Sequence, residues 1–399
     1  MTRFPTSSPA AFARAWARAA SLGLALLAAG CGGGGGGNEV VTASTASQLA
    51  PSVTLANVCT LEGEQRFTRS YMDEAYLWWH RIAEVDTQAH GSVDSYFRAL
   101  LVRDPDAAGR PTDRFSTVLT AAAADAMLGA SADPLANVLA SGHDAVPLVS
   151  TLASDGGRKI GYVLFNRHAR GAQDPLIQAF EALQGAGIQD LVLDLRNNPG
   201  GYLYVAQTLA SMVAGPQHAG QVFEELRYNA KRRAPPSGTL RFTNSAPRGE
   251  ATYAAGHPLP QLDLPRVYVL ASGMTCSASE SVVNGLRGVG IEVILVGGTT
   301  CGKPYGFHRK DNCGKSYFAI EFQGHNAQGF GDYAAGFAPT CPVQESPLAA
   351  LGSRTEPLLA AALQHIDSGR CPVQARSTAS PSTRSADPAA GLFGRLLTP

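Results

Sequence analysis

Hydrophobic positions follow two different periods along the middle of this chain. Apolar runs at Lys159–Phe165, Leu191–Leu195 and Val267–Ala271 predict strands, and Leu191–Leu195 is as continuous as a buried parallel strand. Apolar residues at helical spacing occur at Pro175–Leu183 and between Val282 and Val289. Because strands alternate with helices, the pattern predicts an α/β core.

The same pattern divides the chain into regions. Gln65–Leu101 reads as helical, so we expect an N-terminal helical subdomain at residues 56–130. The alternating strands and helices predict one large domain at residues 155–370. Residues 375–399 are rich in serine, proline and alanine, which predicts a disordered tail.

The N-terminus has the pattern of an export signal. A short apolar core, Ser21–Ala29, follows the positive charges Arg3, Arg14 and Arg18 and is too short to span a bilayer. Small residues then precede Cys31, as at the processing site of bacterial lipoproteins; an ordinary signal peptide with an incidental cysteine is the alternative. We therefore expect a signal peptide at residues 1–31, acylation of Cys31 and a flexible tether at 32–55, which would anchor the protein in the bacterial envelope, facing the periplasm or the cell surface.

Charge and cysteine content narrow the function classes. The chain has 32 basic and 32 acidic residues, so no basic surplus favours a nucleic-acid partner. Besides Cys31 there are six cysteines, an even number that favours disulfides in an exported protein. Fifteen pairings are possible, and the proximity of Cys301 and Cys313 favours that pair first. No His/Cys spacing resembles a zinc site, so we expect no metal and no cofactor.

Ser277 is the first candidate for chemistry. It stands in the small-residue turn between a predicted strand and a predicted helix, so helix N–H groups would point toward a ligand beside it. A serine hydroxyl needs a base to become a nucleophile. Ser277 with Glu280 also has the spacing of a capping box, in which the hydroxyl would bond the helix's own amides.

Lys303 is the second candidate, in a Gly/Thr-rich loop after the strand Val293–Val296. A lysine acts as a general base only when it is neutral, so its pKa must fall by several units from about 10.4. Ser-Lys pairs are a known variant of the catalytic triad. The stretch from Gly297 to Lys303 also fits a phosphate-binding loop, but Pro304 replaces the required Ser or Thr, so we expect no nucleotide.

A third stretch, Asp194-Leu195-Arg196-Asn197-Asn198-Pro199-Gly200-Gly201, follows the strand Leu191–Leu195. Paired glycines let main-chain N–H groups approach a ligand closely. With the N–H of Ala278, those of Gly200 and Gly201 could form an oxyanion hole, which stabilises a transition state by several kcal/mol.

Together these three stretches resemble the C-terminal (tail-specific) processing peptidases: D-L-R-x-N-x-G-G, then S-A-S-E, then T-x-G-K, in this order. The resemblance implies that Ser277 is the nucleophile and Lys303 the base. It also implies a crotonase-like (Clp-like) catalytic core and a polypeptide substrate. The oxyanion donors it implies are the amides of Gly200 and Ala278, with Gly201 less certain, while Glu280 and Thr300 match supporting positions.

The chain also departs from this family. Lys303 lies 26 residues after Ser277 (303 − 277), one more than is usual. Phe307 stands where some members carry a glutamine, although His308 is adjacent. The interval from Phe115 to Ile160 is too short for the PDZ module of the family. A serine endopeptidase is therefore the first hypothesis, an inactive peptide-binding protein on the same fold the second, and an esterase-like hydrolase the third.

Overall fold

The structure is a computed structural model that describes residues 49–106, 109–128, 145–232, 238–346, 349–373 and the backbone of 395–396. Residues 49–399 form one compact unit. The expected signal peptide and Cys31 lie outside the described residues.

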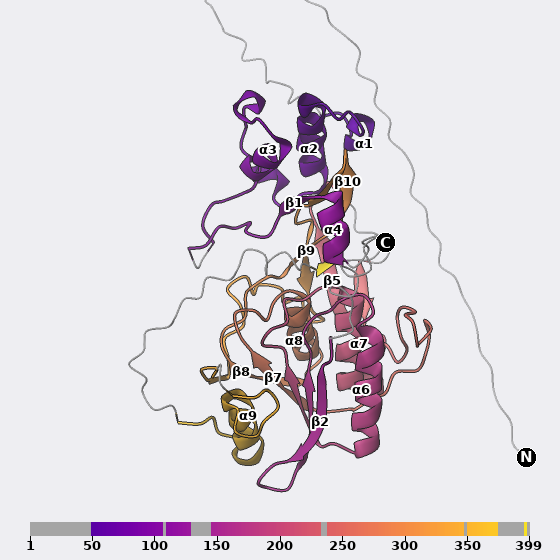
Figure 1. Ribbon diagram of the computed structural model, residues 1–399, viewed down its shortest axis with the longest axis vertical. Coiled ribbons are helices and arrows are strands. Elements are labelled where there is room, and N and C mark those ends of the chain that lie inside the picture. Colours follow the sequence, from indigo (N-terminus) through magenta and orange to yellow (C-terminus); the bar gives the residue numbers. More distant parts are fainter. Residues whose placement is uncertain are drawn as a thin grey trace, which may run out of the picture. The chain divides into compact units, whose positions relative to one another are not determined.

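A six-stranded sheet runs through the middle of the fold, in the order β13-β8-β7-β4-β3-β2 (Figure 1). Its pairs are parallel except β2 with β3. The strands are β2 (Leu148–Ala153), β3 (Lys159–Leu164), β4 (Asp190–Asp194), β7 (Arg266–Ala271), β8 (Glu292–Gly297) and β13 (Cys341–Pro342). The expected α/β core is confirmed.

Helices cover both faces of this sheet because successive strand residues point to opposite sides. On β4, Leu191 and Leu193 belong to the core packed against the first helix layer, whereas Val192 belongs to the core under α9 (Pro357–Ser368). The first layer consists of α6 (Gln173–Ala186), α7 (Leu203–Ala214) and α8 (Ala278–Gly288). Burial on both faces explains why the β4 sequence is a near-continuous apolar run.

Two smaller sheets join the core to the N-terminal region. One has the order β14-β9-β12-β5-β6 and the other the order β1-β11-β10. The strands of the first are β5 (Val222–Tyr228), β6 (Thr239–Arg241), β9 (Tyr305–Phe307), β12 (Phe322–His325) and β14 (Arg395–Leu396). Those of the second are β1 (Thr117–Thr120), β10 (Lys310–Asn312) and β11 (Lys315–Phe318).

The N-terminal region differs from the expected helical subdomain. It contains α2 (Leu61–Ala75), α3 (Val93–Ala99) and α4 (Ala121–Leu128), but β1 pairs with β11, and the Cys59–Cys313 disulfide adds a covalent link. Residues 56–130 therefore do not form a separate helical unit, because a hairpin from the C-terminal half completes them. Figure 1 shows β10 beside these helices.

Three other expectations change. The last four residues of the expected tether form α1 (Ser52–Leu55), and Ser52 bonds Glu74 through both its N–H and its hydroxyl. Within the expected disordered tail, Arg395–Leu396 forms a strand, β14, on β9. The Cys301–Cys313 pairing is wrong, because Cys313 joins Cys59 and Cys301 joins Cys276. The third disulfide joins Cys341 to Cys371.

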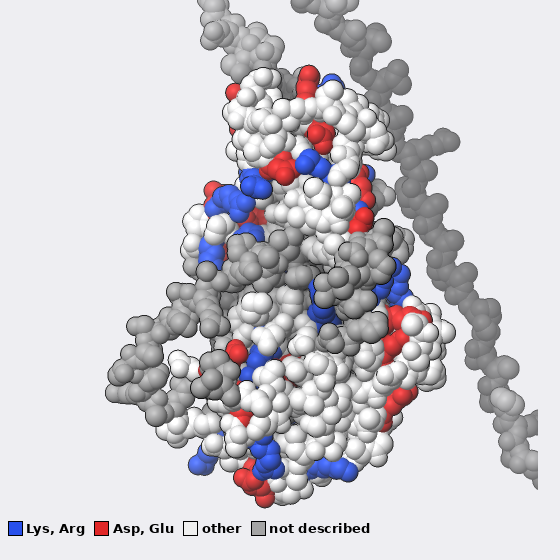
Figure 2. Space-filling view, in the orientation of Figure 1, with Lys and Arg blue, Asp and Glu red and all other residues white. Residues whose placement is uncertain are grey.

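The charges on the surface agree with the equal numbers of basic and acidic residues in the sequence. On the face shown in Figure 2, basic and acidic side chains are interspersed. Among the residues that the structure describes, no helix has the length and apolar character needed to cross a membrane. The expectation that no PDZ module lies between Phe115 and Ile160 stays a prediction, since residues 129–144 fall outside the described ranges.

Candidate active site

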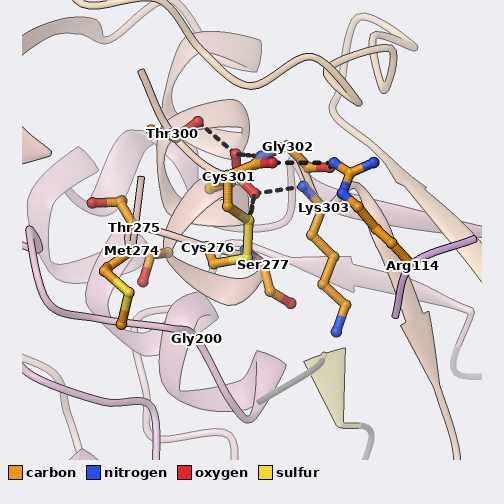
Figure 3. The surroundings of a disulfide bond; sticks show 12 residues. Arg114, Gly200, Met274, Thr275, Cys276, Ser277, Thr300, Cys301, Gly302 and Lys303 are labelled. Carbon is orange, nitrogen blue, oxygen red and sulfur yellow. Dashed lines mark hydrogen bonds between the residues drawn. A yellow bond between two sulfur atoms is a disulfide. The ribbon is translucent and has the colours of Figure 1, made fainter. Parts of the chain in front are cut away.

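The three stretches singled out in the sequence meet at one edge of the central sheet. The Gly200 turn follows β4, the Ser277 turn follows β7, and the Lys303 loop follows β8. These strands are adjacent and parallel, so their carboxyl ends lie side by side. Figure 3 shows the hydroxyl of Ser277 and the amine of Lys303 extending into the same space.

Ser277 is held in a strained conformation at the start of α8. Its φ of 58° lies in the left-handed region, which costs a non-glycine residue about 1–3 kcal/mol. The side chain is fully buried, and Oγ has no hydrogen-bond partner in the structure. Ser277 and Glu280 are arranged as a capping box, with the hydroxyl facing the Glu280 N–H and the carboxylate facing the Ser277 N–H. Only the second contact is a hydrogen bond, at 2.9 Å, so the capping arrangement does not tie up the hydroxyl.

The glycine pair packs directly against this serine. A Cβ on Gly200 would lie 2.9 Å from Ser277 Cβ and 2.7 Å from the Cys276 carbonyl oxygen, so only glycine fits. A Cβ on Gly201 would lie 2.2 Å from the His168 carbonyl oxygen. Both residues have positive φ, 95° and 140°. The glycines thus allow a close approach to the serine turn, while the predicted approach of their N–H groups to a ligand stays a prediction.

The amides near Ser277 are not equally available. The Gly200 N–H donates to Asn198 Oδ1 at 3.0 Å. Among the described residues, neither the Gly201 N–H nor the Ala278 N–H donates a hydrogen bond. Ala278 is the first residue of α8, where helix N–H groups have no intrahelical acceptor. Gly201 and Ala278 therefore offer the uncommitted donors, while Gly200 is already engaged.

Lys303 is among the largest fully buried side chains. Its Nζ lies 4.9 Å from the ring centroids of both Phe115 and Phe307. Removal from water disfavours the charged amine, whereas aromatic ring faces favour a cation. Phe307, which occupies the position where some relatives have glutamine, thus forms one wall of the amine's environment. His308 contacts Glu321 at 2.5 Å instead.

Glu280 connects the serine turn to the lysine loop. One carboxylate oxygen, Oε2, accepts from the N–H of Ser277 at 2.9 Å and of Lys303 at 2.8 Å. The other, Oε1, accepts from Thr300 Oγ1 at 2.5 Å and from the Gly302 N–H at 2.9 Å. Burial raises the pKa of this carboxyl, and its four donors oppose that rise. Glu280 and Thr300 thus lie where supporting residues were expected, although the contact is to the main chain of Lys303.

The Cys276–Cys301 disulfide adds a covalent link between the same two segments. Cys276 immediately precedes Ser277, and Cys301 lies two residues before Lys303. Figure 3 shows the sulfur pair between the serine turn and the lysine loop. Cys276 and Cys301 also lie near Glu280, and Cys341 and Cys371 near His365, at metal-like spacing. Both cysteine pairs are disulfides, so neither group offers a thiolate ligand.

Arg114 is a site residue that sequence reasoning missed. Its Nη2 donates to the carbonyl oxygens of Cys301 at 3.2 Å and Gly302 at 3.0 Å. The guanidinium also stacks on Phe115, at 4.5 Å from the ring centroid. Burial lowers the pKa of Arg114. The segment before β1 therefore clamps the lysine loop, a contact that no local pattern in the sequence signals.

His168 and Asn198 form a second feature that sequence reasoning missed. Asn198 Nδ2 donates to the Phe165 carbonyl, so its Oδ1 accepts from the Gly200 N–H and from His168 Nδ1 at 3.1 Å. This orientation places the proton of the neutral imidazole on Nδ1. Complete burial lowers the pKa of His168 to about 3. The pair fixes the glycine turn beside Ser277.

A buried ion pair anchors the other side of that turn. Arg196 donates to both carboxylate oxygens of Glu356, at 2.7 and 2.9 Å, and its Nε contacts Asp194 at 2.9 Å. Glu356 also accepts from the Leu359 N–H and so caps α9. Arg196 and Asp194 of the D-L-R stretch therefore tie β4 to α9 and do not reach the serine.

The chain is similar to known proteins over the part that carries this site. The sequence model of peptidase family S41 matches residues 159–320. A carboxyl-terminal-processing protease from Picosynechococcus sp. is 32% identical over 157 residues, 39% of this chain and 32% of that protein. The chain thus spans about a third of that curated relative's length. A solved structure of a candidate S41 protease from Bacteroides fragilis has a TM-score of 0.58 at 21% identity, covering 75% of this chain and 96% of that one. This last likeness shows the fold.

The α/β fold and these matches make residues 159–320 similar to the peptidases of family S41. The predicted resemblance to the C-terminal processing peptidases is confirmed.

Proposed function

We propose that this protein is a serine-type peptidase in which Ser277 is the nucleophile and Lys303 the general base. The observation that carries the proposal is the Ser277 hydroxyl: it is fully buried, strained in its backbone and without a hydrogen-bond partner. A strand-to-helix turn with a strained serine is how other serine hydrolases present a nucleophile. The inactive alternative offers no reason to keep a buried hydroxyl unpaired, which costs about 1–3 kcal/mol.

The mechanism follows from the positions of these groups. Ser277 Oγ attacks the scissile carbonyl carbon while its proton passes to the neutral amine of Lys303. The carbonyl oxygen becomes an oxyanion held by the N–H groups of Ala278 and Gly201, with Gly200 contributing if its bond to Asn198 is given up. Lys303 then returns the proton to the departing amine as the carbon–nitrogen bond breaks. Water, deprotonated by Lys303, hydrolyses the acyl-enzyme and restores the hydroxyl of Ser277.

In this mechanism Glu280 and Thr300 are positioning residues. They bond the main chain on both sides of the site, at Ser277, Gly302 and Lys303, and bond neither the Ser277 hydroxyl nor the Lys303 amine. We also infer a crotonase-like (Clp-like) core, supported by a mostly parallel sheet whose strand-to-helix turns after β4 and β7 carry the glycine pair and the serine. The substrate class is polypeptide, with no cofactor.

We further propose that the protein is exported and anchored by acylation of Cys31. The supporting features are the N-terminal charge and apolar pattern and three disulfides, which persist in oxidising compartments. Replacing Cys31 with serine should then move the protein from the membrane fraction to the soluble fraction of cells. Unchanged fractionation would refute the anchor and leave the catalytic proposal intact.

The test of catalysis uses the Ser277→Ala variant and a serine-reactive fluorophosphonate. Hydrolysis of labelled casein should disappear in Ser277→Ala but persist in Ser368→Ala, a control at the exposed end of α9. The reagent should modify Ser277, identified by peptide mass spectrometry. Equal hydrolysis by Ser277→Ala and the unmodified protein would refute the nucleophile. Turnover of small esters without casein hydrolysis would refute a peptidase and favour an esterase.

A further inference from the structure

Two residues near the C-terminus, Arg395 and Leu396, lie on the strand that follows the Lys303 loop. β14 (Arg395–Leu396) pairs in parallel with β9, with Arg395 opposite Gly306 and Leu396 opposite Phe307. β9 begins two residues after Lys303. Phe307, whose ring lies 4.9 Å from Lys303 Nζ, is therefore also a pairing partner of the tail. Figure 3 draws the pale yellow strand just beyond the end of the Lys303 side chain.

The main-chain groups of β9 show which edge the tail covers. On one side β9 pairs with β12, and the Gly306 carbonyl accepts from the Glu321 N–H at 2.8 Å. Because N–H and C=O groups alternate in direction along a strand, those of Tyr305 and Phe307 face the opposite edge. That edge is the one occupied by β14. In the parallel register, Gly306 faces away from the tail, so the N–H and C=O of Arg395 face β9.

An unpaired strand edge binds extended polypeptides by adding a strand, with affinity supplied by main-chain hydrogen bonds. An edge next to a serine and a lysine that cleave polypeptides is suited to hold a substrate. We propose that the β9 edge is a docking site for extended polypeptide main chain, and that the chain's own C-terminal segment occupies it as an intramolecular competitor. This inference rests on the proposed peptidase function for its consequence, although the docking itself does not require catalysis.

Tethering makes such competition effective. Twenty-one residues (374–394) separate Val373 from Arg395. A covalent tether of that order gives an effective concentration of about 1 mM. Suppose that the free tail peptide binds the edge with a dissociation constant near 100 μM. The tethered tail then lowers the affinity of a competing peptide for the edge by about tenfold. The simpler alternative is that the tail merely protects an exposed edge from aggregation, without competing with any ligand.

Binding to inactive protein separates these alternatives. The probe is a fluorescein-labelled peptide of residues 391–399 (GLFGRLLTP), measured by fluorescence anisotropy against Ser277→Ala proteins. A chain ending at Val373 keeps Cys371 for its disulfide and should bind the probe about tenfold more tightly than the full-length chain. Arg395→Pro in the full-length chain removes an N–H that faces β9 and should match the truncated protein. Ala386→Pro, upstream of the paired residues, should match the full-length protein.

In the catalytically competent background, truncation at Val373 should lower the KM for a fluorogenic peptide by a similar factor without changing kcat. Equal probe affinity for truncated and full-length Ser277→Ala chains, or no binding to either, would overturn the docking proposal. Tighter binding by the truncated chain without any hydrolysis by the unmodified protein would support docking and refute the peptidase. Hydrolysis with a KM that truncation leaves unchanged would support the peptidase and refute docking.

Discussion

Ser277 and Lys303, 26 residues apart in the chain (303 − 277), share one hydrogen-bond acceptor. Oε2 of Glu280 receives the main-chain N–H of Ser277 at 2.9 Å and that of Lys303 at 2.8 Å. The carboxylate therefore fixes the distance between the two peptide backbones that carry the proposed nucleophile and base. Neither side chain takes part in this link, so the atoms proposed for catalysis differ from those that hold the two backbones in place.

The first prediction concerns this shared acceptor. Glu280→Gln keeps the size of the side chain but replaces one acceptor oxygen with an NH2 group, which faces N–H donors. We expect kcat to fall by about 10–100-fold with little change in KM, and the free energy of unfolding to drop by about 1–3 kcal/mol. Peptide hydrolysis and urea denaturation measure these effects. Glu292→Gln, at an exposed residue of β8, is the control, and equal kcat in both variants would contradict the positioning role.

The second prediction separates two disulfides of similar loop length. The sequence separations of Cys276–Cys301 and Cys341–Cys371 are 25 and 30 residues. Chain entropy then gives each bond about 3.5 kcal/mol of stability. Replacing either pair with serines should therefore cause similar losses in unfolding free energy, measured in denaturant.

Only the Cys276–Cys301 pair links the serine turn to the lysine loop, so only its loss should lower kcat beyond what unfolding explains. Activity is compared at a temperature where both double variants are fully folded, as judged by circular dichroism. A matching decrease in kcat for the Cys341/Cys371 variant would show that the effect is one of general stability.

The third prediction concerns the buried amine. Lys303→Met retains a chain of similar volume between the rings of Phe115 and Phe307 but cannot accept a proton. We expect hydrolysis to fall by at least about 1000-fold, while the free energy of unfolding changes by less than about 1.5 kcal/mol, as for other volume-conserving core substitutions. Lys159→Met, at an exposed position of β3, is the control. Residual activity within tenfold of the unmodified protein would exclude Lys303 as the base.

The fourth prediction concerns the clamp on the lysine loop. Arg114→Gln removes the donors to the carbonyl oxygens of Cys301 and Gly302, so the loop loses contacts that hold Lys303 in place. We expect a loss of about 1–3 kcal/mol in unfolding free energy and a several-fold fall in kcat. Arg354→Gln, which breaks an exposed pair with Asp155 and an exposed contact to the Ala153 carbonyl, should change stability by less than about 0.5 kcal/mol. Similar kinetics in the two variants would remove Arg114 from the site.

Sequence reasoning found the parts of this site that local sequence patterns indicate. A strand, a small-residue turn and a helix start fix where Ser277 lies, and a strand followed by a Gly/Thr-rich loop fixes Lys303. Parallel strands bring such turns to one sheet edge whatever the distance along the chain. The closeness of these stretches could therefore be predicted before any coordinates.

The missed contacts depend on long-range packing. Arg114 lies 187 residues from Cys301, and its direction is set by β1 pairing with a hairpin from the other half of the chain. The disulfide prediction failed for a related reason: closeness in sequence favoured Cys313, but the β10–β11 hairpin carries that cysteine to Cys59. Likewise, the engagement of the Gly200 amide depends on the orientation of the Asn198 side chain, which no sequence pattern specifies.

The last prediction uses the buried imidazole beside the glycine turn. The pKa of His168 is about 3 in the folded protein, because burial disfavours the charged ring, whereas its ordinary value is 6.5. Below pH 6.5 the unfolded chain binds a proton that the folded chain does not, so stability falls as the pH decreases toward 3. Above about pH 6.5 His168 causes little loss of stability, because its imidazole is then mostly neutral in the folded and the unfolded chain alike. Between pH 7 and pH 5 it should decrease by about 2 kcal/mol.

Comparison with His168→Asn isolates this effect, because the new amide can still donate to Asn198 Oδ1 but does not titrate. Urea denaturation at pH 7 and pH 5 should show a smaller acid-induced loss in the variant than in the unmodified protein. His80→Asn, at an exposed histidine, is the control. If the unmodified protein and His168→Asn lose equal stability between these pH values, the imidazole is not held neutral by burial. The assignment of a fixed proton to Nδ1, which orients Asn198 and the Gly200 turn, would then be wrong.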